Sequence, residues 1–148
     1  MSLHQFAFRY PGIQLDLVEH EPVVLKLAED WFALDSVPNL TKHIADGHSF
    51  IENSPESTWD IVIVDAYDTQ ARDSGGLQHA CLGALKRVLR PGGAVAWNLI
   101  GSLSRCEPVA SFLSSAGSVF DTVRVVPVID AGEEFAPDAT RNIVIIAT

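Results

Sequence analysis

Apolar residues along this chain follow two periods, one typical of helices and one typical of buried strands. Helical spacing predicts helices at Leu3–Tyr10, Pro22–Phe32, Ser49–Asn53 (a single turn), Leu77–Leu89 and Glu107–Ser115. Short, nearly continuous apolar runs between turn residues predict strands. These runs are Ile13–Val18, Leu40–Ala45, Asp60–Asp65, Ala94–Leu99, Phe120–Val128 and Asn142–Ala147.

Strands and helices alternate through most of this order. Alternation of this kind predicts a mostly parallel α/β sheet with helices on both faces, in a Rossmann-like arrangement. The last two strands have no helix between them, so we expect them to pair as a C-terminal antiparallel hairpin. With 148 residues, of which 47% are hydrophobic, the chain fits a single domain over residues 1–148.

The chain begins close to a strand that ends in an acid. In nucleotide-binding α/β domains such a strand is normally the second, and the first strand with its Gly-rich turn occupies about 30 residues before it. Only residues 1–13 precede Gln14 here, so we expect a truncated domain without that first strand. The missing strand would lie in the middle of the sheet, between Ile13–Val18 and Ile61–Val64. Without it, we expect these two strands to pair directly, or another copy in a homo-oligomer to cover their exposed edges.

Composition narrows the classes of partner. The net charge is −9, and the ten Lys and Arg residues do not cluster, which argues against a nucleic-acid partner. No apolar run approaches the length of a membrane span, and no signal peptide is visible, so we expect a cytoplasmic protein. Cys81 and Cys106 lie far apart in the sequence, with no Cys-x-x-Cys spacing, so cytosolic free thiols are the simplest interpretation. The acidic surface either aids solubility or attracts a cationic substrate such as a polyamine.

Three acids follow predicted strands, at the sheet edge where α/β proteins bind ligands. Glu19 is placed to accept hydrogen bonds from ribose hydroxyls, and Asp46, followed by Gly47, from an adenine amino group. Asp65 would face the reactive group of a bound nucleoside, with Asp68 sharing that space. Each acid also has a structural interpretation. Glu19 can cap the helix that starts near Pro22, Asp65 can cap a helix or anchor a loop, and Asp46 and Gly47 form a common turn dipeptide.

Other polar and aromatic residues point less clearly to chemistry. His43, Asp46 and His48 match no known metal-site spacing, so no metal is expected. Trp31, Trp59 and Trp97 fall within element patterns and are interpreted as core or half-buried packing residues. Tyr67 lies between two acids, and it either lines a substrate pocket or simply packs.

Four segments of the sequence carry a family resemblance, in this order and at suitable spacing. They are Val18–Pro22, Ala45–Ile51, Trp59–Asp68 and Leu85–Gly93. Together they resemble the spermidine synthase family, the aminopropyltransferases of the S-adenosylmethionine-dependent methyltransferase superfamily. The most specific element is Asp-Gly-x-x-Phe followed by a strand that ends Asp-x-x-Asp. The resemblance implies a class I methyltransferase-like fold and a cosubstrate that is S-adenosylmethionine or its decarboxylated form.

The resemblance also implies roles for single residues. Glu19 would bind the ribose, Asp46 the adenine, Asp65 would orient or deprotonate an attacking amine, and Asp68 would hold the cationic amine substrate. The sequence departs from the family in lacking the Gly-rich loop, the Pro-x-Gly-Pro-like gate loop and the N-terminal β-domain. These departures favour adenosine recognition over aminopropyl transfer. A small-molecule methyltransferase and a non-catalytic interaction or oligomerisation module remain as alternatives.

Overall fold

The computed structural model describes residues 2–65, 74–104, 107–129, 132 and 134–148. The chain divides into two compact units, residues 1–50 and 51–148, and each is described by itself. The first unit contains α1 (Leu3–Arg9), β1 (Leu15–Glu19), α2 (Pro22–Phe32), the 3-10 helix η1 (Leu34–Ser36) and β2 (Leu40–Ile44). Helix α3 (Gly47–Asn53) begins at the end of this unit. The helices and strands predicted for this part of the chain are therefore confirmed.

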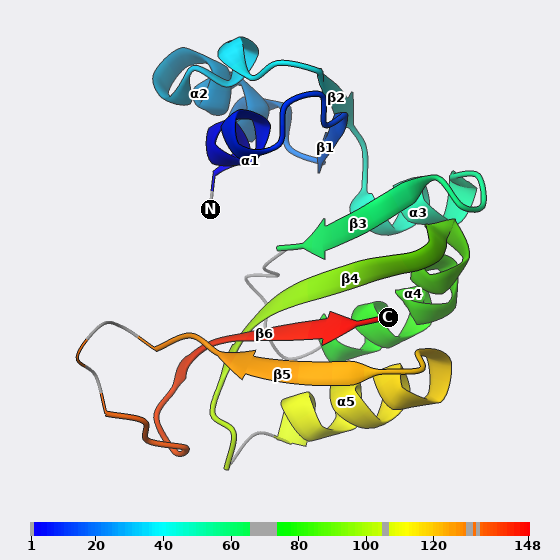
Figure 1. Ribbon diagram of the computed structural model, residues 1–148, viewed down its shortest axis with the longest axis vertical. Coiled ribbons are helices and arrows are strands. Elements are labelled where there is room, and N and C mark those ends of the chain that lie inside the picture. The colour runs from blue at the N-terminus through cyan, green and yellow to red at the C-terminus, as the bar shows by residue number, and fades with distance from the viewer. Residues whose placement is uncertain (1, 66–73, 105–106, 130–131, 133) are drawn as a thin grey trace. The chain divides into compact units, whose positions relative to one another are not determined.

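The first unit is built on one parallel strand pair. Strands β1 and β2 run side by side, with Leu15 opposite Leu40 and Glu19 opposite Ile44, and α2 forms the crossover between them (Figure 1). Its core is small. The buried residues are Ala7, Leu25, Leu34 and Val37.

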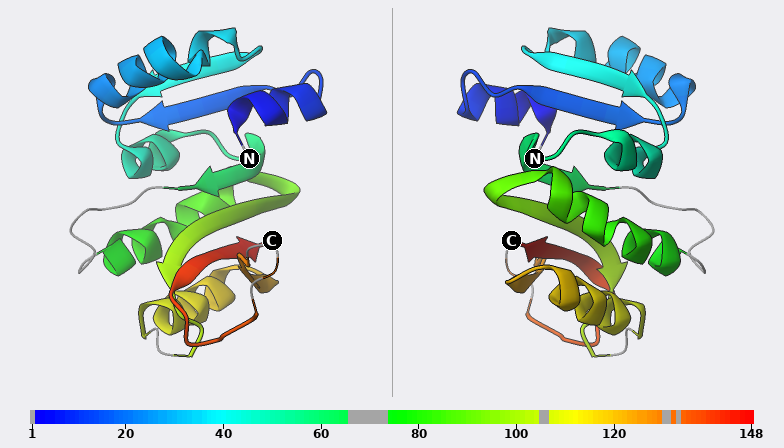
Figure 2. Two further views of the ribbon diagram at one scale, coloured as in Figure 1. Left: turned by 90° about the vertical axis from the view of Figure 1, so that its left-hand side faces the viewer. Right: turned by 90° about the vertical axis from the view of Figure 1, so that its right-hand side faces the viewer.

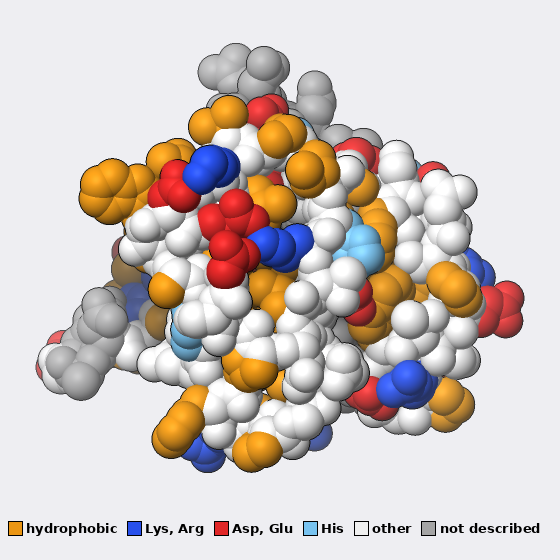
Figure 3. Space-filling view, turned by 90° about the horizontal axis from the view of Figure 1, so that it is seen from above, with side chains coloured by type: hydrophobic (Ala, Val, Ile, Leu, Met, Phe, Trp, Pro, Cys, Tyr) orange, Lys and Arg blue, Asp and Glu red, His pale blue; other side chains and the backbone are white. Residues whose placement is uncertain are grey.

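The apolar stripe of α2 is mostly exposed to solvent. Leu25 is the buried residue of this helix, whereas Val23 is 67%, Trp31 77% and Phe32 74% exposed. The interpretation of Trp31 as a packing residue is therefore wrong. Periodicity predicts which residues share a helix face, but it does not supply the partner that would bury that face. Figure 3 shows hydrophobic side chains exposed around a group of acidic and basic ones.

The second unit is a four-stranded sheet in the order β3-β4-β6-β5 (Figures 1 and 2). The strands are β3 (Trp59–Val64), β4 (Leu89–Gly101), β5 (Val123–Pro127) and β6 (Arg141–Ala147), and the helices are α4 (Ser74–Val88) and α5 (Glu107–Val119). Strands β3 and β4 are parallel, and β6 is antiparallel to both β4 and β5. The predicted antiparallel pairing of the last two strands is confirmed.

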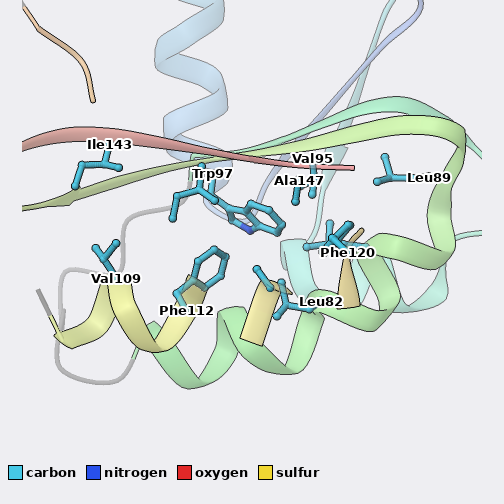
Figure 4. Close-up of a cluster of buried hydrophobic side chains, with 12 residues drawn as sticks. Leu82, Leu89, Val95, Trp97, Val109, Phe112, Phe120, Ile143 and Ala147 are labelled. Atoms are coloured by element: carbon cyan, nitrogen blue, oxygen red, sulfur yellow. The ribbon is translucent and has the colours of Figure 1, made fainter. Parts of the chain in front are cut away.

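The main core lies between this sheet and helices α4 and α5 (Figure 4). Trp97 of β4 is 1% exposed and packs edge-on against two rings, with centroid distances of 5.0 Å to Phe112 and 5.8 Å to Phe120. Such edge-to-face contacts are a favourable geometry for aromatic pairs. Trp97 therefore fixes which face of β4 is directed toward the helices, as the sequence predicts for a buried strand residue.

A close backbone approach explains one glycine near the start of β4. A Cβ atom on Gly93 would lie 2.9 Å from the carbonyl oxygen of Arg90 and 3.0 Å from that of Asp60. Both contacts are with backbone atoms, so a larger residue would force the strands apart. The register of β3 and β4 also shifts between Trp59 and Ile61, next to this position.

The predicted direct pairing of Ile13–Val18 with Ile61–Val64 is wrong. In the described part of the chain, β1 pairs with β2 alone and β3 with β4 alone. Each strand keeps the parallel partner that its own crossover helix provides, so the chain forms two sheets rather than one. The open edge of β3 carries exposed apolar side chains, with Ile61 59% and Ile63 55% exposed. Coverage of these edges by another chain remains a prediction.

No helix within the described ranges is long and apolar enough to cross a membrane.

Candidate functional site

Glu19 ends β1 and anchors the turn into α2. Its Oε1 atom accepts a hydrogen bond from the backbone N–H of Glu21 at 2.9 Å and lies 3.2 Å from Nδ1 of His20. The Glu19 side chain is 27% exposed, against 69% for that of His20. Glu19 does not cap α2, whose N-cap residue is Glu21 and has no side-chain cap bond, so the predicted capping role is wrong. The Glu19 side chain instead holds the turn before the helix, and part of it is accessible to a ligand.

Asp46 follows β2 and caps α3. Its Oδ1 atom accepts a hydrogen bond from the backbone N–H of Ser49 at 2.8 Å, the geometry of an N-cap. This backbone bond, with a second from the Ser49 side chain, holds the pKa of the Asp46 carboxyl below its ordinary value. Asp46 is thus an ionised acceptor at neutral pH. The helix it caps starts at Gly47, two residues earlier than the predicted turn.

The two acids of the first unit lie at the same end of one sheet. Because β1 and β2 are parallel and Glu19 is opposite Ile44, the carboxyl ends of both strands coincide. The backbone N–H of Ala45 donates to the carbonyl oxygen of Glu19 at 3.1 Å, which continues the pairing to the residue before Asp46. This end is where open α/β sheets bind ligands. The binding roles of both acids remain predictions.

Asp65 directly follows β3 in the second unit and is bonded to a side chain of the neighbouring strand. The Nδ2 atom of Asn98 donates a hydrogen bond to Oδ1 of Asp65 at 2.9 Å. The parallel register places Val64 opposite Trp97, so Asp65 and Asn98 follow as the next residues of the two strands. Because Trp97 is directed toward the helices, Asn98 is directed to the opposite face of the sheet.

Sequence reasoning did not find Asn98. The signal was present, because Asn98 is the polar residue within the apolar run Ala94–Leu99. A polar side chain inside a buried strand needs a hydrogen-bond partner, and here that partner is a candidate catalytic acid. The other two candidates for substrate binding, Tyr67 and Asp68, lie outside the described residues.

One of the two histidines considered as metal ligands has another partner. Nε2 of His43 lies 2.8 Å from Oδ1 of Asp16, and its ring centroid is 4.7 Å from that of Phe50. Among the residues that the structure describes, no group of three or more His, Cys, Asp or Glu side chains could hold a metal ion.

The order of elements and the mixed sheet define the class of this protein as a methyltransferase-like Rossmann fold. A probable spermidine synthase from Corynebacterium glutamicum matches with a TM-score of 0.74 at 22% identity, covering 99% of this chain and 51% of that one. A spermidine synthase in complex with the transition state analogue AdoDATO gives a TM-score of 0.77 at 15% identity, with 97% and 49% covered. Human methyltransferase-like protein 13 in complex with SAH gives a TM-score of 0.70 at 24% identity, and the match covers 97% of this chain and 64% of that one.

The sequence is similar to curated spermidine synthases, which confirms the resemblance seen in the motifs. Spermidine synthase 1 of Hyoscyamus niger is 34% identical over 86 residues, covering 55% of this chain and 27% of the relative. Spermidine synthase 2 of Arabidopsis thaliana is 27% identical over 111 residues, covering 72% and 33%. The chain thus spans about a quarter to a third of the length of these relatives. No family model matches it.

Proposed function

We propose that this chain is a spermidine synthase-like transferase domain that binds S-adenosylmethionine or its decarboxylated form. The observation that carries the proposal is the 34% identity to a curated spermidine synthase over 86 residues. Support also comes from the fold, because structures that share it were solved with AdoDATO and with SAH.

The donor and acceptor chemistry of the first unit fits such a nucleoside. Ribose hydroxyls and the adenine amino group donate hydrogen bonds, and ionised carboxylates accept them. Glu19 would accept from the ribose hydroxyls and Asp46, with Gly47 beside it, from the adenine. The lowered pKa of Asp46 favours this role, since it keeps the carboxylate ionised. The proposal needs no metal ion.

Asp65 is the proposed catalytic residue of the transfer. An amine attacks only when its nitrogen is neutral, so the substrate ammonium first gives a proton to the Asp65 carboxylate. The nitrogen lone pair then forms a bond to the carbon beside the sulfonium. The carbon–sulfur bond breaks, and its electron pair stays on sulfur, which becomes a neutral thioether. Asp68, and Tyr67 beside it, would hold the other parts of a cationic amine.

Methyl transfer is the second candidate reaction. It is supported by the likeness to human methyltransferase-like protein 13, which was solved with SAH. The same acids would then hold S-adenosylmethionine, and the attacked carbon would be its methyl group. The acceptor would again be a small molecule.

Calorimetric titration of the 148-residue chain tests the binding proposal. The ligands are S-adenosylmethionine, its decarboxylated form and methylthioadenosine, with a nucleoside lacking adenine as the control. We expect binding of all three adenosine ligands. A transfer assay with a primary diamine then decides between aminopropyl and methyl transfer. Absence of binding at millimolar ligand would overturn the proposal and leave a non-catalytic interaction module.

The proposal extends to assembly and location. A homo-oligomer would cover the open edges of β1 and β3, which pair on one side only among the described strands. The proposal also places the protein in the cytoplasm.

A further inference from the structure

We propose that Asn98 is a positioning residue for Asp65. The inference rests on the proposed function, because that function assigns proton acceptance to Asp65. It adds a second residue, from a different strand, on which the transfer step depends.

The first observation is the hydrogen bond itself. Asp65 is exposed and stands just after the last residue of β3, where rotation about its terminal torsion is broad. The bond from Asn98 Nδ2 to Oδ1, at 2.9 Å, fixes the plane of the carboxylate. Once that plane is fixed, the direction in which Oδ2 faces an incoming amine is fixed as well.

The second observation is that Asn98 is held rigidly. Strand β4 is paired on both sides, with Trp97 opposite Val64 of β3 and Asn98 opposite Val144 of β6. The neighbouring Trp97 is 1% exposed and packs on Phe112. The backbone of Asn98 therefore cannot move away from Asp65 unless a core residue is displaced. Catalytic groups need this kind of support from well-packed elements.

The third observation concerns charge. An amide donor holds a carboxylate without neutralising it, whereas Lys or Arg at the same place would form an ion pair. An ion pair of that kind does form near the start of β3. There Nη1 of Arg90, from β4, lies 2.7 Å from Oδ2 of Asp60. At the other end of β3, the partner that the described residues provide for Asp65 is the neutral amide of Asn98. A neutral donor at this place fits the proton-accepting role that the proposed function gives to Asp65.

Substitutions at Asn98 test the inference in the 148-residue chain. Asn98→Leu keeps the branched shape but removes the donor, and Asn98→Gln keeps an amide donor on a longer side chain. A lost hydrogen bond to a charged group corresponds to a decrease in kcat of about tenfold to hundredfold. We expect that decrease for Asn98→Leu in transfer to a primary amine, with KM for the nucleoside unchanged and partial recovery in Asn98→Gln.

The outcomes separate this inference from the proposed function. If wild type transfers and Asp65→Asn does not, yet Asn98→Leu has wild-type kcat, the positioning role is wrong and the function stands. If Asn98→Leu lowers kcat, raises the nucleoside KM and lowers Tm together, the role of Asn98 is only structural. That result also overturns the inference. Asn98→Ala, which removes the donor without adding a charge, replaces Asn98→Leu should that variant not fold. Absence of transfer by wild type would overturn both proposals.

Discussion

The carboxylate of Asp46 lies 2.8 Å from the backbone nitrogen of Ser49, so the candidate adenine ligand is also the cap of helix α3. A substitution at this position therefore changes two properties. Asn at an N-cap accepts the same backbone hydrogen bond but carries no charge, whereas Ala accepts none. The pair of variants Asp46→Asn and Asp46→Ala separates capping from ligand binding.

We expect Asp46→Ala to lower the free energy of unfolding by about 0.5–2 kcal/mol, the usual effect of losing a cap. It should also weaken binding of every adenosine ligand. Asp46→Asn should retain most of the stability and still bind these ligands more weakly, because the amide lacks the negative charge. Urea denaturation and calorimetry measure the two effects. Wild-type affinity in Asp46→Asn would contradict the adenine role.

The lowered pKa of Asp46 predicts how stability depends on pH. The Ser49 backbone N–H, and then its side chain, stabilise the ionised form in the folded state, so the folded pKa lies below the unfolded one. The stability from this carboxylate is therefore complete above the unfolded pKa of about 3.9, and it is lost as the pH falls through the folded pKa. The Tm difference between wild type and Asp46→Asn should be constant near neutral pH and should shrink in acid. A difference that grows in acid would contradict this assignment.

The order of helices and strands could be predicted because each element has its own local period. The short apolar run Ala94–Leu99, for example, is visible in the sequence, and its Trp97 lies in the core. Strand pairing could not be predicted in the same way. Which edge of β1 is occupied depends on contacts between distant segments, and the expected pairing with β3 does not form.

The candidate site was predictable in part for a related reason. Acids that follow strands are recognisable in sequence, and Glu19, Asp46 and Asp65 do follow β1, β2 and β3. Their partners depend on register. Asn98 meets Asp65 only because Val64 is opposite Trp97, and a shift by one residue would direct Asn98 toward the core.

Glu19 offers a test of ribose recognition. Glu19→Gln keeps an oxygen that can accept from the backbone N–H of Glu21, so the turn should be preserved. The substitution removes the negative charge of the carboxylate, which favours hydrogen bonds from both ribose hydroxyls. We expect wild type to prefer a ribonucleoside ligand over its 2′,3′-dideoxy analogue, and Glu19→Gln to lose most of that preference. Calorimetry with both ligands checks this, and an unchanged preference would remove Glu19 from the site.

Trp97 should dominate the stability of the second unit. Removing a buried Trp side chain costs about 3–5 kcal/mol, and Trp97 is 1% exposed between two aromatic rings. We expect Trp97→Ala to unfold at much lower denaturant concentration than Trp97→Phe, which keeps one ring. Ser118→Ala, on the outer turn of α5, serves as a surface control. Equal stability of the two Trp97 variants would contradict the packing described for this core.

The open edge of β3 predicts self-association. Edge strands with exposed apolar side chains pair with other chains unless a charge or a proline blocks them, and Ile63 is 55% exposed on this strand. Ile63→Lys places a charge there at little cost in stability, because the side chain is already largely exposed. Val126→Lys is the matched control, since Val126 is 45% exposed on β5, at the other edge of the same sheet.

Light scattering after size exclusion distinguishes these variants. We expect wild type and Val126→Lys to form oligomers in a concentration-dependent manner and Ile63→Lys to be monomeric at the same concentrations. The charge acts because two lysines brought together across an antiparallel pair repel each other, whereas two isoleucines pack. If Val126→Lys also became monomeric, the association would not be specific to β3. A monomeric wild type at high micromolar concentration would show that no second copy covers this edge.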